Sequence, residues 1–188
     1  MNLYYTGASP DNLRKARESA PSHSHGYGWT PQKMTPHDAP YFLDNGAYTD
    51  HFDSKAFRNT IDEALTKMPR SPDFIVLPDV YGAAEATIER HRNWLYEHKL
   101  PVGSGECMRY WVLQPGLPVS EQFDAIEGAQ GVFVGGPQRW KRAHAAEIIR
   151  RANERNLRTH LGNPGGEDGL VWAYRMGFDS VDTTSVSQ

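Results

Sequence analysis

Short apolar runs alternate with segments of helical periodicity along this chain, and most of these runs end at a polar residue or a glycine pair. Five of them end in this way, at Asp44, Asp79, Gln114, Gly135–Gly136 and Asp182. A regular alternation of strand-like and helix-like segments predicts a parallel sheet with crossover helices.

Seven segments have the length and composition of strands: 3–6, 41–44, 73–78, 108–113, 131–134, 157–161 and 177–184. Asp44, Asp79 and Gln114 follow one another at intervals of 35 residues, about the length of one βαβ step. We therefore predict that residues 1–188 form one domain, a compact TIM-type (β/α) barrel. The carboxyl ends of barrel strands share one face, so we expect the polar strand ends to meet in one pocket there.

The stretch 21–40 leaves the number of barrel strands open. It is rich in Pro, Ser, His and Gly and shows almost no periodicity, so it is predicted to be a long loop. His23 and His25 are two residues apart, a weak metal pattern, and a solvated loop is the favoured interpretation. The barrel is either incomplete or has an eighth strand hidden in this stretch, and an open doubly wound sheet is the alternative fold.

Composition excludes several classes of protein. The 188 residues include one cysteine, Cys107, so an internal disulfide and a zinc site of several cysteines are excluded. No apolar run approaches the roughly 20 residues that span a bilayer, and the first residues lack the pattern of a signal peptide. We expect a cytoplasmic protein without membrane partners. The net charge of -3 means that contacts to nucleic acid would need a local basic patch.

Six motifs, in order over residues 41–182, resemble the queuine/archaeosine tRNA-guanine transglycosylase family. They are Leu43–Tyr48 (LDNGAY), Pro72–Asp79 (PDFIVLPD), Val112–Gly116 (VLQPG), Val134–Gly136 (VGG), His160–Gly162 (HLG) and Gly177–Asp182 (GFDSVD). Each motif alone is weak, but six in family order are specific. An isolated strand-end aspartate can equally cap a helix or order a turn.

The resemblance implies base exchange at a guanine nucleotide without a cofactor or a metal. Asp182 would be the nucleophile on C1′, and Asp44 the general acid and base for the departing and incoming bases. Asp79 would accept hydrogen bonds from N1–H and the amino group of a guanine-like base. The remaining base-binding residues would be Gln114, Gly135 and Gly136 near O6, with Tyr48 and Leu161 as the two stacking walls.

Departures from the family pattern concern the nucleic acid. Members that act on tRNA carry a zinc site of three cysteines and a histidine, and basic residues after the nucleophile strand; this chain has neither. The minimal, zinc-free sequence is similar to phage and bacterial DNA transglycosylases, which insert 7-deazaguanine bases into DNA. The implied partners are DNA, with its target guanine extruded, and a free 7-deazaguanine base. A second copy of the chain in a homodimer could supply the missing basic residues.

Three basic residues open the predicted helix after Gly136, and phosphate contacts could come from Arg139, Lys141 and Arg142. The alternative is that they form a solvated helix end. Two other functions stay open: the same exchange on tRNA or a nucleoside, and a non-catalytic relative that binds a base or nucleic acid.

Overall fold

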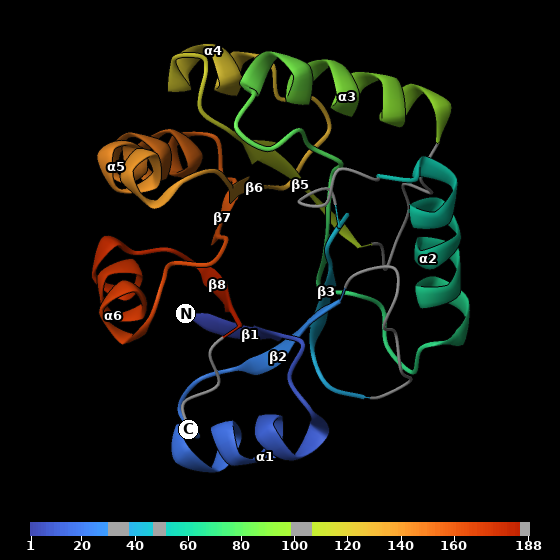
Figure 1. Ribbon diagram of the computed structural model, residues 1–188, viewed down its shortest axis with the longest axis vertical. Coiled ribbons are helices and arrows are strands. Elements are labelled where there is room, and N and C mark those ends of the chain that lie inside the picture. Colours follow the sequence, from blue (N-terminus) through green and yellow to red (C-terminus); the bar gives the residue numbers. More distant parts are fainter. Residues whose placement is uncertain (30–37, 47–51, 99–106, 185–188) are drawn as a thin grey trace.

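Eight parallel strands close into a barrel in the order in which they occur along the chain (Figure 1). The computed structural model describes residues 1–29, 38–46, 52–98 and 107–184. The strands are β1 (Asn2–Thr6), β2 (His25–Trp29), β3 (Tyr41–Leu43), β4 (Phe74–Val76), β5 (Met108–Leu113), β6 (Gly131–Val134), β7 (Arg158–Leu161) and β8 (Ser180–Thr183). Pairing of β1 with both β2 and β8 closes the sheet. The TIM-type barrel is thus confirmed, and the open doubly wound sheet is excluded.

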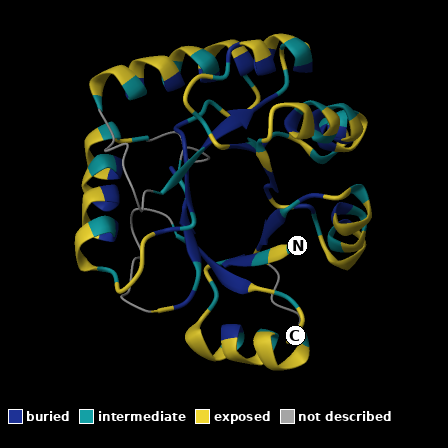
Figure 2. Ribbon diagram, turned by 180° about the vertical axis from the view of Figure 1, so that it is seen from behind, coloured by how far each residue is buried: buried dark blue, intermediate teal, exposed yellow. Residues whose placement is uncertain are grey.

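Helices surround the barrel (Figure 1). Those in the described part of the chain are α1 (Pro10–Ser19), α2 (Ser54–Lys67), α3 (Ala84–Glu97), α4 (Val119–Asp124), α5 (Gln138–Glu154) and α6 (Glu167–Met176). The strands are mostly buried, and the helices turn exposed faces to solvent (Figure 2). None of these helices has the length and apolarity needed to span a membrane, within the residues that the structure describes.

The eighth strand, β2, lies inside the stretch predicted to be a loop, so that prediction is wrong for His25–Trp29. Gly26 and Gly28 point into the barrel, where an added Cβ would lie 2.9 Å from the rings of Tyr4 and Phe42, respectively. Because the two glycines leave room for these rings, β2 lacks the apolar alternation that identifies a strand. His25 is buried, with Nε2 2.8 Å from the carbonyl of Ala20, so it does not belong to a solvated loop.

Replacement of Gly26 by alanine is expected to destabilise the barrel. The new Cβ would lie 2.5 Å from the carbonyl oxygen of Pro40, which is backbone and must move to make room. We expect the free energy of unfolding to fall by about 1–3 kcal/mol, the usual cost of overpacking. Denaturant unfolding measures it, with the exposed Ser24→Ala as control; an unchanged midpoint for Gly26→Ala would contradict the close approach.

Two apolar layers hold the barrel together. The inner layer consists mainly of aromatic rings from alternate strand residues, with Phe74 stacked between Phe42 at 4.8 Å and Tyr110 at 4.0 Å. The outer layer fills the space between strands and helices and includes Trp111 and Phe57, both fully buried. The aromatic inner layer closes the barrel beneath the strand ends, so the strand ends form the floor and wall of a pocket rather than the mouth of a channel.

The start of α2 is a further point that the sequence leaves open. Both Asp53 and Ser54 could cap α2 by residue type; in the structure Asp53 is the cap, accepting a hydrogen bond of 2.9 Å from the N–H of Ala56. Ser54 is the first helical residue, and its hydroxyl contacts His98 Nε2 at 2.7 Å. Both residue types are good caps, which is why sequence alone places this boundary within one residue only.

Candidate active site

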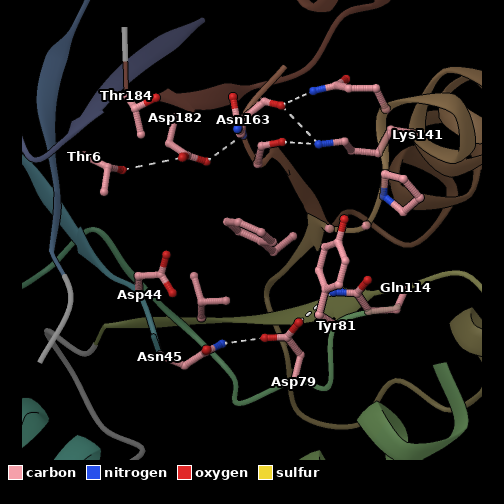
Figure 3. A pocket seen from close by; sticks show the side chains of 17 residues that line it. Thr6, Asp44, Asn45, Asp79, Tyr81, Gln114, Lys141, Asn163, Asp182 and Thr184 are labelled. Atoms are coloured by element: carbon pink, nitrogen blue, oxygen red, sulfur yellow. Dashed lines mark hydrogen bonds between the residues drawn. The ribbon is translucent and has the colours of Figure 1, made fainter. Parts of the chain in front are cut away.

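One pocket of about 410 Å³ at the strand ends brings together residues that are far apart in sequence (Figure 3). Its lining includes the predicted residues Asp44, Asp79, Gln114, Gly135, Gly136, Lys141 and Asp182. Its volume lies in the range of small-molecule sites, roughly 300–1,000 Å³. The predicted convergence of three aspartates, a glutamine and a glycine pair is therefore present in the structure.

Asp182, on β8, is held on one oxygen and left more open on the other. Oδ1 lies 3.0 Å from His160 Nε2 and accepts a hydrogen bond of 3.2 Å from the N–H of Asn163. Oδ2 is 3.5 Å from the hydroxyl of Thr6, a long contact. The carboxylate is thus fixed in orientation, with Oδ2 the oxygen that has fewer bonds to the protein (Figure 3).

His160 fixes the orientation of the Asp182 carboxylate. His160 lies in one of the sequence motifs, but no role is predicted for it from the sequence. It is fully buried on β7, next to the ring of Phe133. Burial lowers the pKa of His160, although Asp182 opposes that shift. In the neutral ring, Nε2 donates to the carboxylate, and Nδ1, 2.9 Å from Ser180 Oγ, accepts from that hydroxyl. Residues along β7 alternate between inward-facing and outward-facing positions, and His160 is at an inward-facing one among aromatic residues. This alternation is the sequence feature from which an inward-facing His160 could be predicted.

Asp44 follows β3 on the side of the pocket opposite Lys141 (Figure 3). Its Oδ1 accepts a hydrogen bond of 2.9 Å from the N–H of Gly46, a local turn that aims the carboxyl group. Burial, supported by the nearby carboxylates of Asp182 and Asp79, raises the pKa of Asp44 to about 7. A carboxyl group with such a pKa can both give and take a proton near neutral pH.

This raised pKa predicts a pH-dependent stability. The unfolded chain releases the Asp44 proton near pH 3.9, and the folded state keeps it to about pH 7. Between these values the folded state binds more protons, so the free energy of unfolding falls as pH rises. Asp44→Asn removes the titration. We expect it to be more stable than wild type at pH 8 by about 1–2 kcal/mol, discounted because water can enter the pocket.

Denaturant unfolding of both proteins at pH 5 and pH 8 measures this effect. Asp168→Asn, which changes an exposed aspartate of α6, controls for the substitution itself. If Asp44→Asn retained the wild-type difference between the two pH values, the raised pKa of Asp44 would be wrong.

The wall next to Asp44, across the pocket from Asp182, is a network of amides around Asp79 (Figure 3). Its Oδ1 accepts a hydrogen bond of 3.0 Å from Asn45 Nδ2, and its Oδ2 accepts one of 2.6 Å from Gln114 Nε2. Gln114 Oε1 in turn accepts from the N–H of Gly82 at 3.1 Å. Burial raises the pKa of Asp79, and the bonds from Asn45 and Gln114 oppose this. The network holds one carboxylate and one amide side by side, which gives the pocket an edge of acceptors and donors.

Glycines are required where β6 ends because the Gln114 side chain lies against the backbone there. A Cβ on Gly135 would lie 2.5 Å from Gln114 Nε2. Gly136 has φ +80, and a Cβ there would lie 2.7 Å from Pro115 Cδ. The predicted glycine pair thus gives the pocket room for an amide and a close approach of backbone.

One of the two predicted stacking residues, Leu161, does not line the pocket. Leu161 alternates with the inward-facing His160, so its side chain packs in the outer apolar layer and does not line the pocket. Tyr48 lies outside the described residues. The aromatic residues that do line the pocket are Phe133, from β6, and Tyr81, which is 50% exposed. Both follow or belong to strands that the sequence predicts, but sequence alone does not give the direction of their rings.

The three predicted phosphate-binding residues differ in their positions: Lys141 is buried in the pocket wall, whereas Arg139 and Arg142 are exposed. Lys141 is 4% exposed and its Nζ donates to the carbonyls of Gly162 at 2.6 Å and Asn163 at 3.1 Å. Lys141 lines the pocket. Both predictions for this residue are therefore wrong: it neither contacts phosphate from the helix surface nor belongs to a solvated helix end. Arg139 and Arg142 are exposed, and the guanidinium of Arg142 lies over the ring of Trp172.

Chemically, this pocket offers an oriented carboxylate, a carboxyl group that titrates near neutral pH, and a polar edge for a flat ligand. Among the residues that the structure describes, no group of three or more His, Cys, Asp or Glu side chains could hold a metal ion. Comparison of the sequence with protein-family models and with curated proteins finds no match.

Proposed function

We propose that this protein is a base-exchange transglycosylase that replaces guanine in DNA with a 7-deazaguanine derivative through a covalent glycosyl-enzyme intermediate. The observation that carries the proposal is the meeting, in one pocket, of the oriented carboxylate of Asp182, the carboxyl group of Asp44 with its raised pKa, and the amide and carboxylate edge around Asp79. The order of the motifs along the sequence supports the same assignment.

In the first half of the reaction, Oδ2 of Asp182 attacks C1′ as the bond from C1′ to N9 of guanine breaks. Asp44 gives its proton to the departing base, which leaves as neutral guanine. In the second half, the incoming base attacks C1′ through N9, loses its proton to Asp44 and releases Asp182. The raised pKa of Asp44 supports this double role, since retaining glycosyl transfer needs one nucleophilic carboxylate and one proton carrier.

Base recognition follows from the polar edge. Each oxygen of Asp79 has two acceptor positions, so besides Asn45 and Gln114 it can accept from N1–H and the 2-amino group. Gln114 Nε2 uses one N–H on Asp79, and the other can donate to O6 together with the N–H of Gly136. Phe133 and Tyr81, in place of Leu161, provide aromatic faces for stacking.

Contacts to the nucleic acid would come from the first turns of α5. Gln138 and Lys141 of this helix line the pocket, and the neighbouring residues Arg139 and Arg142 are exposed. Arginines there can bind the phosphates that flank an extruded nucleotide. The assignment of DNA rather than tRNA is taken from the resemblance of the sequence motifs to those of the DNA-acting transglycosylases, and the exchange experiment below decides between the two nucleic acids.

Exchange of labelled guanine tests the proposal whichever base is the natural incoming one. The protein is incubated with tritiated guanine and with duplex DNA, single-stranded DNA, tRNA or a nucleoside, and acid-insoluble or nucleoside-bound label is counted. The proposal predicts incorporation into DNA. Incorporation into tRNA alone would reassign the substrate, and base binding without any exchange would support the non-catalytic alternative.

A further inference from the structure

Lys141 places a positive charge inside the pocket wall. Its side chain extends from the first turn of α5, is almost fully buried, and uses two of its three N–H groups on the carbonyls of Gly162 and Asn163. Asn163 also accepts from the side chain of Gln138. The same pocket contains Asp182 on β8 (Figure 3). A lysine is rarely this buried unless it is paired, so its place in the wall needs an explanation.

The order of groups around the barrel mirrors the order of atoms around guanine. Successive strands end at Asp79 (β4), Gln114 (β5), Gly135–Gly136 (β6), Gly162 (β7) and Asp182 (β8). Around the base, the 2-amino group and N1 are followed by O6, position 7, position 8 and N9. With N1 at Asp79, O6 at Gln114 and N9 directed to Asp182, position 7 faces the wall between β6 and β7.

That wall is where the ammonium group of Lys141 lies. A cationic substituent at position 7 would seek the carbonyl oxygens of Gly162 and Asn163, but these already accept hydrogen bonds from the ammonium group of Lys141, so the two cations would share the same acceptors and repel each other. We propose that Lys141 selects the incoming base by its substituent at position 7, favouring an uncharged or anionic acceptor such as a nitrile or carboxylate and disfavouring an alkylammonium group. This assignment rests on the function proposed above.

The electrostatics agree with this geometry. Burial lowers the pKa of Lys141 to about 8, and Asp182 opposes the shift, so the side chain is mainly cationic at pH 7. Two ammonium groups in one desolvated pocket repel each other, whereas a nitrile nitrogen can accept the third N–H of Lys141. We expect discrimination between matched bases of at least about 10-fold.

Binding of three free bases to the intact protein tests the inference: 7-deazaguanine, 7-cyano-7-deazaguanine and 7-aminomethyl-7-deazaguanine. Calorimetry at pH 7 should show that wild type binds the cyano base at least about 10-fold more tightly than the aminomethyl base. Lys141→Met should bind 7-deazaguanine but lose most of this preference, and Lys141→Glu should reverse it. If Lys141 were purely structural, its replacement would instead lower the affinity for all three bases by a similar factor.

The outcomes separate this inference from the function on which it rests. Wild type that binds the aminomethyl base as tightly as the cyano base overturns the role of Lys141, whether or not the variants fold. A preference that survives in folded Lys141→Met does the same. If the bases bind and binding depends on Asp79, the base pocket stands even then; if wild type binds none of the three, both the base pocket and the inference fall.

Discussion

Asp182→Asn is expected to lower the rate of base exchange by at least about 10³-fold, the scale of loss when a covalent nucleophile is removed. An asparagine can keep the hydrogen bonds of Oδ1 to His160 and to the N–H of Asn163. It has no anionic oxygen with which to attack C1′. We therefore expect free-base affinity to stay within a few-fold of wild type while exchange of labelled guanine into DNA disappears.

Asp179→Asn is the matched control, because Asp179 precedes β8 and lies at the opposite end of that strand from the pocket. A denaturing gel gives a second readout: wild type incubated with DNA should form a protein–DNA adduct, and Asp182→Asn should not. Exchange at the wild-type rate by Asp182→Asn would remove this residue from the mechanism.

Asp79→Asn is expected to reduce the affinity for guanine by about 100-fold, equivalent to roughly 3 kcal/mol from two charge-assisted hydrogen bonds. The asparagine can present only one accepting oxygen, while Asn45, Gln114 and the base all offer N–H donors toward this position. One donor would be left unpaired in the buried edge. Calorimetry with guanine measures the loss directly.

Asp73→Asn is a close control for this variant. Asp73 precedes β4, as Asp79 follows it, and it accepts a hydrogen bond of 2.7 Å from the hydroxyl of Tyr4 at the far end of the barrel. Its replacement should affect stability and leave guanine affinity unchanged. Equal affinity of wild type and Asp79→Asn for guanine would show that the base does not bind against this edge.

The barrel could be predicted from the sequence because seven of its strands are apolar runs separated by helical periodicity. The strand that the sequence did not predict, β2, has glycines at its inward-facing positions, where the rings of Tyr4 and Phe42 fill the space. Its identity as a strand depends on side chains from other strands, which no local pattern contains. The alternation itself, rather than the count of strands, was the reliable signal.

The pocket residues also divide into those that the sequence predicts and those that it does not. Strand-end residues such as Asp44 and Asp182 could be placed because topology alone brings strand ends together. A phosphate contact would put Lys141 on the helix surface, although it begins the stripe that continues with Ala145, Ile148 and Ala152, all buried. That periodicity is a usable sign of an inward-facing lysine. The ring directions of Phe133 and Tyr81 depend on packing and have no such sign.

The most direct test of the central claim is nucleoside mass spectrometry of duplex DNA that has been incubated with the purified protein and 7-cyano-7-deazaguanine. The proposed function predicts a 7-deazaguanine deoxynucleoside in the digest with wild type, and none with Asp44→Asn or Asp182→Asn. DNA that stays unmodified by folded wild-type protein, with this base and with 7-deazaguanine, would contradict a DNA base-exchange enzyme.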